Sequence, residues 1–214
     1  ERKVFKLLKD IDMGQGWTAY HSLNVSEHTY KKWGEIDFVV VGPKGLVCLE
    51  VKGGGVEFID DIWRFTNRYQ KTERKKEGPF EQVKTAHFSL IKMFKDAGIF
   101  ESLDQKINTG WGVIFPDITW NQSSPEMPKE IISDEKSTKD AKEFKKYLSR
   151  LFEYWMNKGR KLPVVNHDDD VLKRIGHFIR PDFQTSPSLS KTTEVIFNQM
   201  VKHTEDQLDL IESF

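Results

Sequence analysis

The chain has 214 residues, a length typical of one domain or of one domain with a small appendage. Its 33 basic and 33 acidic side chains cancel. This balance excludes a uniformly basic nucleic-acid binder, but not an enzyme whose catalytic carboxylates offset a local basic patch. A single cysteine, Cys48, excludes a disulfide framework and indicates a reducing compartment. No transmembrane run or signal peptide is evident, so we expect a cytoplasmic protein, and the missing initiator methionine suggests a piece of a longer polypeptide.

The first part of the chain predicts a helix followed by a strand and a hairpin. Apolar residues spaced three and four apart predict a helix over 4–9, and 17–25 reads as a short strand. The apolar segments 36–41 and 46–52 are joined by 42–45, which contains glycine and proline. This combination predicts a β-hairpin.

The rest of the chain predicts a second hairpin, a charged loop and alternating strands and helices. The second hairpin pairs 56–59 with 62–65, and the charged stretch 68–77 is expected to be a solvated loop. A helix beginning at Pro79 places four apolar residues on one face, and further helices are expected at 140–157 and after 168–170. Strands are expected at 111–115 and, as a short strand, at 131–132. We therefore expect an α/β protein with a mixed central sheet flanked by helices, with a core over 1–135 and a helical extension over 136–214.

The first hairpin places charged residues together on an otherwise apolar sheet. If Val41 pairs with Leu46, paired positions sum to 87 and Asp37 lies opposite Glu50. Lys52 lies two residues beyond Glu50 and shares its face. Opposed carboxylates are destabilising unless a cation lies between them, and oxygen ligands suit Mg²⁺ or Mn²⁺. The alternative is a surface hairpin whose acidic pair is only a structural ion pair with Lys52.

The segment GEIDFVVVGPKGLVCLEVKGG resembles the core motif of the nuclease-related (NERD) domain of the PD-(D/E)XK nuclease superfamily. The resemblance implies a restriction-endonuclease-like core. It also implies that Asp37 and Glu50 are metal ligands, that the backbone carbonyl of Val51 completes the metal shell, and that Lys52 is the catalytic lysine. Glu1 matches, less closely, a glutamate that the family carries on its first helix.

Two further segments resemble parts of related proteins. PFEQV resembles the glutamine motif of RecB-like members and would add Gln82 to the catalytic residues, although Ala86 stands where those members carry an aromatic residue. HTEDQLDLIESF resembles the segment before the ATP-binding loop of superfamily 1 helicases, which implies a helicase motor in the same polypeptide. Its Gln207 could equally be an ordinary exposed residue, and no phosphate-binding loop motif occurs in the chain.

Basic residues near the predicted hairpins are candidates for DNA contacts. They could grip phosphates, or they could belong to solvated loops. They are Lys31, Lys32, Arg68, Arg74, Lys75 and Lys76.

The function expected is metal-dependent hydrolysis of DNA phosphodiester bonds, and the family resemblance implies a context of phage defence or DNA repair. The alternatives are a catalytically silent DNA-binding module of a helicase, and a protein-interaction or oligomerisation domain. No membrane partner is expected, and assembly into a homo-oligomer stays open.

Overall fold

The computed structural model describes residues 1–25, 34–99, 107–158, 164, 166 and 170–182. The chain divides into a compact unit, Glu1–Ile179, and a second unit, Arg180–Phe214. All elements given below belong to the first unit. Among the described residues, no helix combines the length and the apolar character that crossing a bilayer requires.

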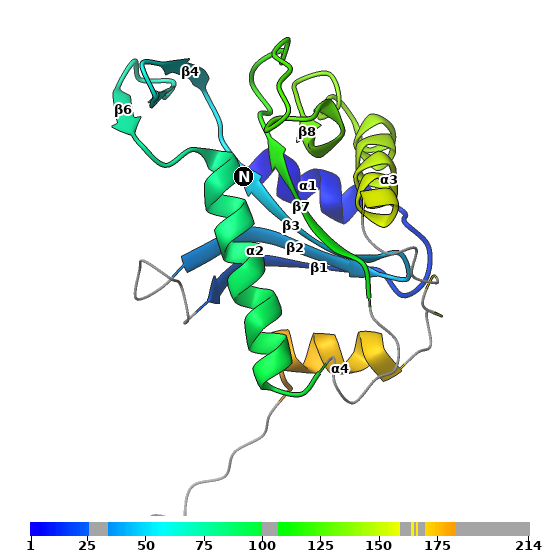
Figure 1. Cartoon of the computed structure of the whole chain (residues 1–214). Coiled ribbons are helices and arrows are strands. Elements are labelled where there is room, and N and C mark those ends of the chain that lie inside the picture. Colours follow the sequence, from blue (N-terminus) through cyan, green and yellow to red (C-terminus); the bar gives the residue numbers. More distant parts are fainter. Residues whose placement is uncertain (26–33, 100–106, 159–163, 165, 167–169, 183–214) are drawn as a thin grey trace, which may run out of the picture. The chain divides into compact units, whose positions relative to one another are not determined.

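A mixed five-stranded sheet, in the order β1-β2-β3-β7-β8, organises the first unit (Figure 1). The first three strands are antiparallel neighbours, whereas β7 runs parallel to β3 and β8 runs parallel to β7. The carboxyl ends of β3, β7 and β8 therefore meet at one edge of the sheet. The mixed α/β architecture predicted from the sequence is confirmed. The strands are β1 (Thr18–Val25), β2 (Gly34–Gly42), β3 (Gly45–Val51), β7 (Thr109–Ile114) and β8 (Ile132–Ser133).

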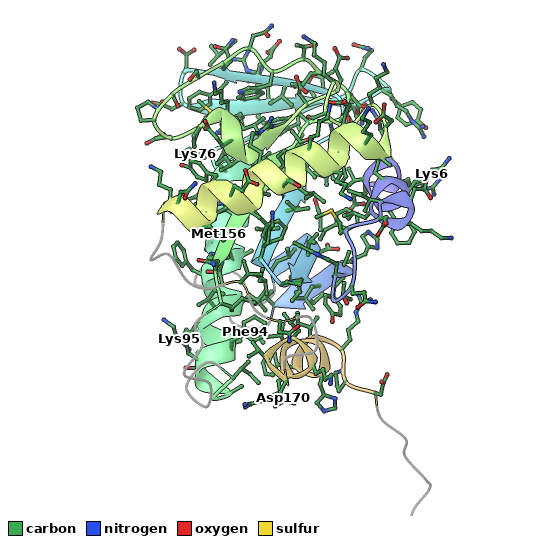
Figure 2. All side chains as sticks on the ribbon, turned by 90° about the vertical axis from the view of Figure 1, so that its right-hand side faces the viewer. Lys6, Lys76, Phe94, Lys95, Met156 and Asp170 are labelled. Atoms are coloured by element: carbon green, nitrogen blue, oxygen red, sulfur yellow. The ribbon has the colours of Figure 1, made fainter. Side chains whose placement is uncertain are left out.

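Helices cover both faces of this sheet. The alternation of side chains along β7 identifies the two faces. The ring of Trp111 lies 5.2 Å from that of His87 on α2 (Pro79–Asp96), so this residue faces α2. At the neighbouring Gly110, a Cβ atom would overlap the ring of Trp155 on α3 (Ala141–Lys158), which covers the opposite face. The helix α1 (Arg2–Asp10) packs beside α3, and Figure 2 shows that the Met156 end of α3 is remote from α1.

The helices predicted from apolar spacing form and bury most of the expected residues, whereas Trp155, Leu172 and Phe178 are half-buried. α2 begins at Pro79, as expected from the fixed φ angle of proline in a first helical turn. α3 packs on β7 and on the short helix η1 (Lys129–Ile131), and α4 (Asp170–Ile179) places Phe178 5.2 Å from Phe94. The domain boundary at 135 stays a prediction. The predicted apolar face of α2 is buried at Val83, Ala86, Leu90 and Phe94, and that of α3 at Phe144, Leu148, Leu151 and Phe152.

A second, three-stranded sheet consists of β4 (Gly55–Ile59), β5 (Ile62–Thr66) and β6 (Thr72–Lys75). Its first hairpin was predicted, and its turn residues Asp60 and Asp61 have φ angles of 53° and 57°, as a two-residue hairpin turn requires. The prediction that 68–77 is a solvated loop is wrong, because 72–75 pairs with β5. Charged residues are usual on an edge strand, so composition alone did not reveal this strand.

Candidate active site

The hairpin that carries Asp37 and Glu50 forms in the predicted register. β2 and β3 pair from Phe38↔Leu49 to Gly42↔Gly45, and every pair sums to 87. The ladder ends one position before Asp37 and Glu50. At this position Val51 donates its backbone N–H to Oδ2 of Asp37 at 2.7 Å. The side-chain carboxylate of Asp37 therefore binds the end of β3, where the backbone pairing of β3 with β2 stops.

The pairing of β2 with β1 is also interrupted at Asp37. The ladder contains His21↔Phe38 and Leu23↔Ile36 but omits the position between them. Ser22, which would face Asp37, has a φ angle of 56°, in the left-handed region that non-glycine residues rarely adopt. Both ladders of β2 thus break at the residue that carries the predicted metal-binding carboxylate.

Glu50 and Lys52 form an ion pair at the carboxyl end of β3. The Nζ atom of Lys52 lies 2.5 Å from Oε1 of Glu50, and the side chains are 22% and 9% exposed. The same ammonium lies 5.9 Å from the centre of the Phe65 ring on β5. Burial raises the pKa of Glu50, and the positive charge and hydrogen bond of Lys52 oppose that rise.

The carboxyl of Asp37 is strongly perturbed. Burial, together with the neighbouring charge of Glu50, raises its pKa from 3.8 to about 7, while the N–H of Val51 acts in the opposite direction. Holding both carboxylates ionised in this place is therefore costly, and a bound cation would reduce that cost.

A group of three carboxylates extends the site beyond the predicted pair. Ligand oxygens of Glu1, Glu35 and Asp37 all lie within 4.8 Å of one another, whereas Glu50 is outside this group. Glu1 occupies the N-cap position of α1, and α1 is tied to the segment after β7 by a 3.0 Å hydrogen bond from Lys3 Nζ to the carbonyl of Pro116. Glu35 was not singled out from the sequence. Its position two residues before Asp37 on a strand could have indicated that both side chains lie on one face.

The loop after β3 is held by a residue that sequence reasoning also missed. Gly54 donates its N–H to Oδ2 of Asp117 at 2.8 Å, and Lys52 donates its N–H to the carbonyl of Ile114 at 2.9 Å. Gly54 has a φ angle of +83°, and a Cβ atom there would overlap the carbonyl oxygen of Thr66. Because Asp117 is 63 residues away in sequence, no local pattern could have identified it.

Gln82 lies in the first turn of α2, on the helix that covers the same face of the sheet as Trp111. Its side-chain oxygen is buried and makes no hydrogen bond within the described part of the chain. No hydrogen bond joins it to Asp37, Glu50 or Lys52. Its role in the site stays a prediction.

Of the six basic residues suggested for DNA contacts, four lie among the described residues, near β5 and β6, and two do not. Arg68 lies after β5, with its guanidinium 4.8 Å from the centre of the Tyr69 ring, and Arg74 and Lys75 are on β6. Lys75 pairs with Glu73 at 3.2 Å. Lys76 follows β6 and is exposed. Lys31, Lys32 and Gln207 lie outside the described residues.

Comparison with protein families identifies the family of this chain. The nuclease-related domain (NERD) family matches residues 1–109, half of the chain, and this range contains the whole carboxylate group and Lys52. The chain therefore belongs to the nuclease-related domain family, which suggests a nuclease-related function. No curated protein and no solved structure matches it.

Proposed function

We propose that this chain is a Mg²⁺- or Mn²⁺-dependent deoxyribonuclease with a restriction-endonuclease-like core. Asp37, Glu50 and the backbone carbonyl of Val51 would hold the ion, with Glu1 and Glu35 beside them. The observation that carries the proposal is the group of Glu1, Glu35 and Asp37, together with the charge of Glu50 at the end of β3, which with burial raises the pKa of Asp37 to about 7. Carboxylate and carbonyl oxygens are the donors that such hard cations prefer, so the residues present fit the ion.

The chemistry follows from the charges at this strand end. A bound divalent cation supplies a nucleophilic water at neutral pH and stabilises negative charge on a phosphate. Lys52 donates hydrogen bonds toward the attacking water or toward the charge that develops on the phosphate oxygens. Glu50 orients the ammonium of Lys52 through their 2.5 Å contact. Gln82, on α2, would position a phosphate or a water.

A cleavage assay tests this proposal. Supercoiled plasmid and a labelled single strand are incubated with wild type, Glu50→Ala and Lys52→Ala in Mg²⁺, Mn²⁺ or EDTA. We expect metal-dependent cutting that falls by about 10²-fold or more in each variant, the usual effect of removing one charged catalytic group. Glu126→Ala and Lys95→Ala, which remove exposed side chains elsewhere, are the matched controls. Cutting that resists EDTA, or that survives in Glu50→Ala, would contradict the proposal.

The ion pair of Lys52 with Glu50 also fits a second candidate, a silent nuclease fold that binds DNA without cutting it. At 2.5 Å, the lysine already neutralises one carboxylate of the site. Binding of DNA by wild type in both EDTA and Mg²⁺, with no cutting in either, would favour this candidate.

We also propose that a helicase motor in the same polypeptide feeds DNA to the site, in phage defence or DNA repair. The support is the resemblance of 203–214 to the segment that precedes a helicase ATP site. Stimulation of cutting by ATP hydrolysis in the full polypeptide would be the expected result, and cutting indifferent to ATP would contradict it.

A further inference from the structure

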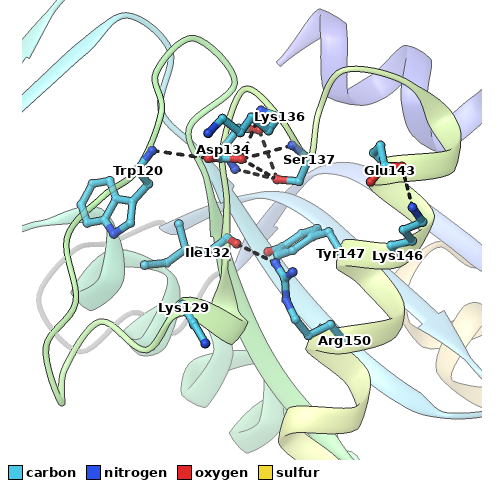
Figure 3. Close-up of a pocket in the computed structure, with 10 residues that line it drawn as sticks. All are labelled: Trp120, Lys129, Ile132, Asp134, Lys136, Ser137, Glu143, Lys146, Tyr147 and Arg150. Atoms are coloured by element: carbon cyan, nitrogen blue, oxygen red, sulfur yellow. Dashed lines mark hydrogen bonds and ion pairs between the residues drawn. The ribbon is translucent and has the colours of Figure 1, made fainter.

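A pocket of about 530 Å³ lies beside β8, the edge strand next to β7 (Figure 3). Its wall is formed by the loop after β7, by η1, by the turn after β8 and by α3. Basic side chains outnumber acidic ones in this wall by four to two, although the whole chain has no net charge. The basic residues are Lys129, Lys136, Lys146 and Arg150, and the acidic residues are Asp134 and Glu143.

Both acidic residues of this pocket already have partners. Glu143 pairs with Lys146 at 2.6 Å. Asp134 accepts backbone N–H groups from Lys136 and Ser137, each at 3.1 Å, and it therefore braces the turn after β8. Its negative charge remains in the pocket but its oxygens are engaged.

The remaining cations have no carboxylate partner among the described residues. Lys129 and Lys136 are exposed and make no ion pair there. Arg150 donates from Nη2 to the carbonyl of Ile132 at 3.2 Å, and its guanidinium lies 5.7 Å from the centre of the Tyr147 ring. Figure 3 shows Lys136 on one side of Ile132, Lys129 on the other and Arg150 beside it, from three different segments. A pocket lined by cations without carboxylate partners favours an anion with several oxygens.

The pocket and the candidate active site lie along one row of the sheet. Glu50 pairs with Val113, and Val113 pairs with Ile132, which lines the pocket. Two strand spacings separate Glu50 from Ile132, which is about 10 Å. Ligands of parallel sheets bind at the carboxyl ends of the strands, and both sites are at that edge.

The loop after β7 connects the candidate active site with the pocket. In the segment after β7, Asp117 accepts the N–H of Gly54 beside Lys52, and Trp120, three residues later, lines the pocket. The Trp120 ring is stacked on Phe115, with centroids 4.6 Å apart and an interplanar angle of 3°. The pocket wall is thereby built on the same loop that holds the segment after β3.

We propose that this pocket is a second phosphate subsite, which binds a backbone phosphate of the DNA strand that is cut at Asp37 and Glu50. This inference rests on the proposed function. At an axial rise of about 3.4 Å per nucleotide, a separation of about 10 Å corresponds to about three nucleotides along a duplex axis. The subsite positions the strand without reading its bases, because phosphate contacts carry no direct sequence information.

The test uses Lys129→Ala/Lys136→Ala, because both lysines are exposed and their loss leaves the hydrogen bonds of the turn intact. Lys95→Ala/Lys173→Ala is the control, since it removes the same charge from α2 and α4. Figure 2 shows Lys95 at the end of α2 remote from Lys76. Binding of labelled single-stranded and duplex oligonucleotides is measured by fluorescence anisotropy in EDTA over a series of KCl concentrations. Cutting is measured separately in Mg²⁺.

We expect the pocket variant to bind more weakly and its slope of log Kd against log salt to fall by about one for each lysine removed. The control should keep the wild-type slope. A pocket variant with the wild-type affinity and slope overturns the inference, as does a wild type that binds neither oligonucleotide. If the slope falls but wild type does not cut, the subsite stands and the proposed nuclease activity fails. If wild type cuts and Glu50→Ala does not, while the slope is unchanged in the pocket variant, the activity stands and the subsite fails.

Discussion

The buried carboxyl of Asp37 should destabilise the protein at neutral pH when no metal ion is present. Its pKa rises from 3.8 to about 7 because of burial and the charge of Glu50. Between these pH values the folded state binds more protons than the unfolded state. The contribution of Asp37 to the free energy of unfolding therefore falls as pH rises from about 4 to about 7. At about 1.36 kcal/mol per pH unit, the full effect is on the order of 4 kcal/mol.

Asp37→Asn should remove this effect and leave the backbone contact in place. The amide oxygen of asparagine can still accept the N–H of Val51, which now lies 2.7 Å from the carboxylate. In EDTA at a pH of about 8 we expect the variant to be more stable than wild type, by up to about 4 kcal/mol, and the difference to vanish near pH ~4. Added Mg²⁺ should stabilise the wild type more than the variant, because a ligand stabilises the state that binds it.

Urea unfolding followed by tryptophan fluorescence, across this pH range, measures the difference. Asp61→Asn, a substitution in the exposed β4–β5 turn at a φ angle of 57°, is the matched control. The buried His87 also titrates in this range, but it is present in both proteins and cancels in the difference. A variant less stable than wild type at a pH of about 8 in EDTA, or a difference independent of pH, would refute the reasoning.

Three other substitutions or modifications test the surroundings of the site. Gly54→Ala should lower the unfolding free energy by about 1–3 kcal/mol in urea, because its Cβ atom would overlap the carbonyl of Thr66 at a φ angle of +83°. Gly14→Ala, at +90° in open space, is its control, and an equal loss in both would contradict the packing argument. Burial lowers the pKa of His87 to about 4, and its ring nitrogens have no hydrogen-bond partner among the described residues, so the contribution of His87 to stability falls as pH drops from about 6.5 to about 4. His87→Leu should abolish that fall, on the order of 3 kcal/mol, in thermal melts over a pH series; an unchanged pH dependence would argue against it. Cys48 is fully buried and burial raises the pKa of its thiol, so iodoacetamide should label it only as fast as the protein unfolds. Rapid labelling of the folded protein, followed by mass spectrometry, would contradict this.

Local features predicted much of the structure. The loop 42–45 sets the register of β2 and β3, because a short connection leaves one antiparallel pairing that keeps both apolar faces buried. The short turn of the second hairpin likewise sets the register of its strands. The spacing of apolar residues predicted the buried face of α2. The periodicity of apolar residues is a property of neighbours along the chain, so it can be read from the sequence before the tertiary structure is known.

Other features depended on contacts that no local pattern encodes. The strand β6 was missed because its stability comes from pairing with β5, not from its own charged composition. Asp117 supports the loop after β3 from a position 63 residues away. The pocket lysines without an ion pair among the described residues, Lys129 and Lys136, come from η1 and the turn after β8, and only the packing of α3 brings Arg150 into the same pocket.

The sequence by itself determined the hairpin and, through its register, the neighbourhood of Asp37, Glu50 and Lys52. Alternation and turn length operate over a few residues, so they can be read along the chain. Only the tertiary structure decided that both ladders of β2 break at Asp37 and that carboxylate oxygens of Glu1 and Glu35 lie within 4.8 Å of those of Asp37. It also decided that basic side chains line one pocket beside β8, two strands from β3. These arrangements require helices and loops distant in sequence to pack on one sheet edge, and that packing is decided by the whole core rather than by any one segment.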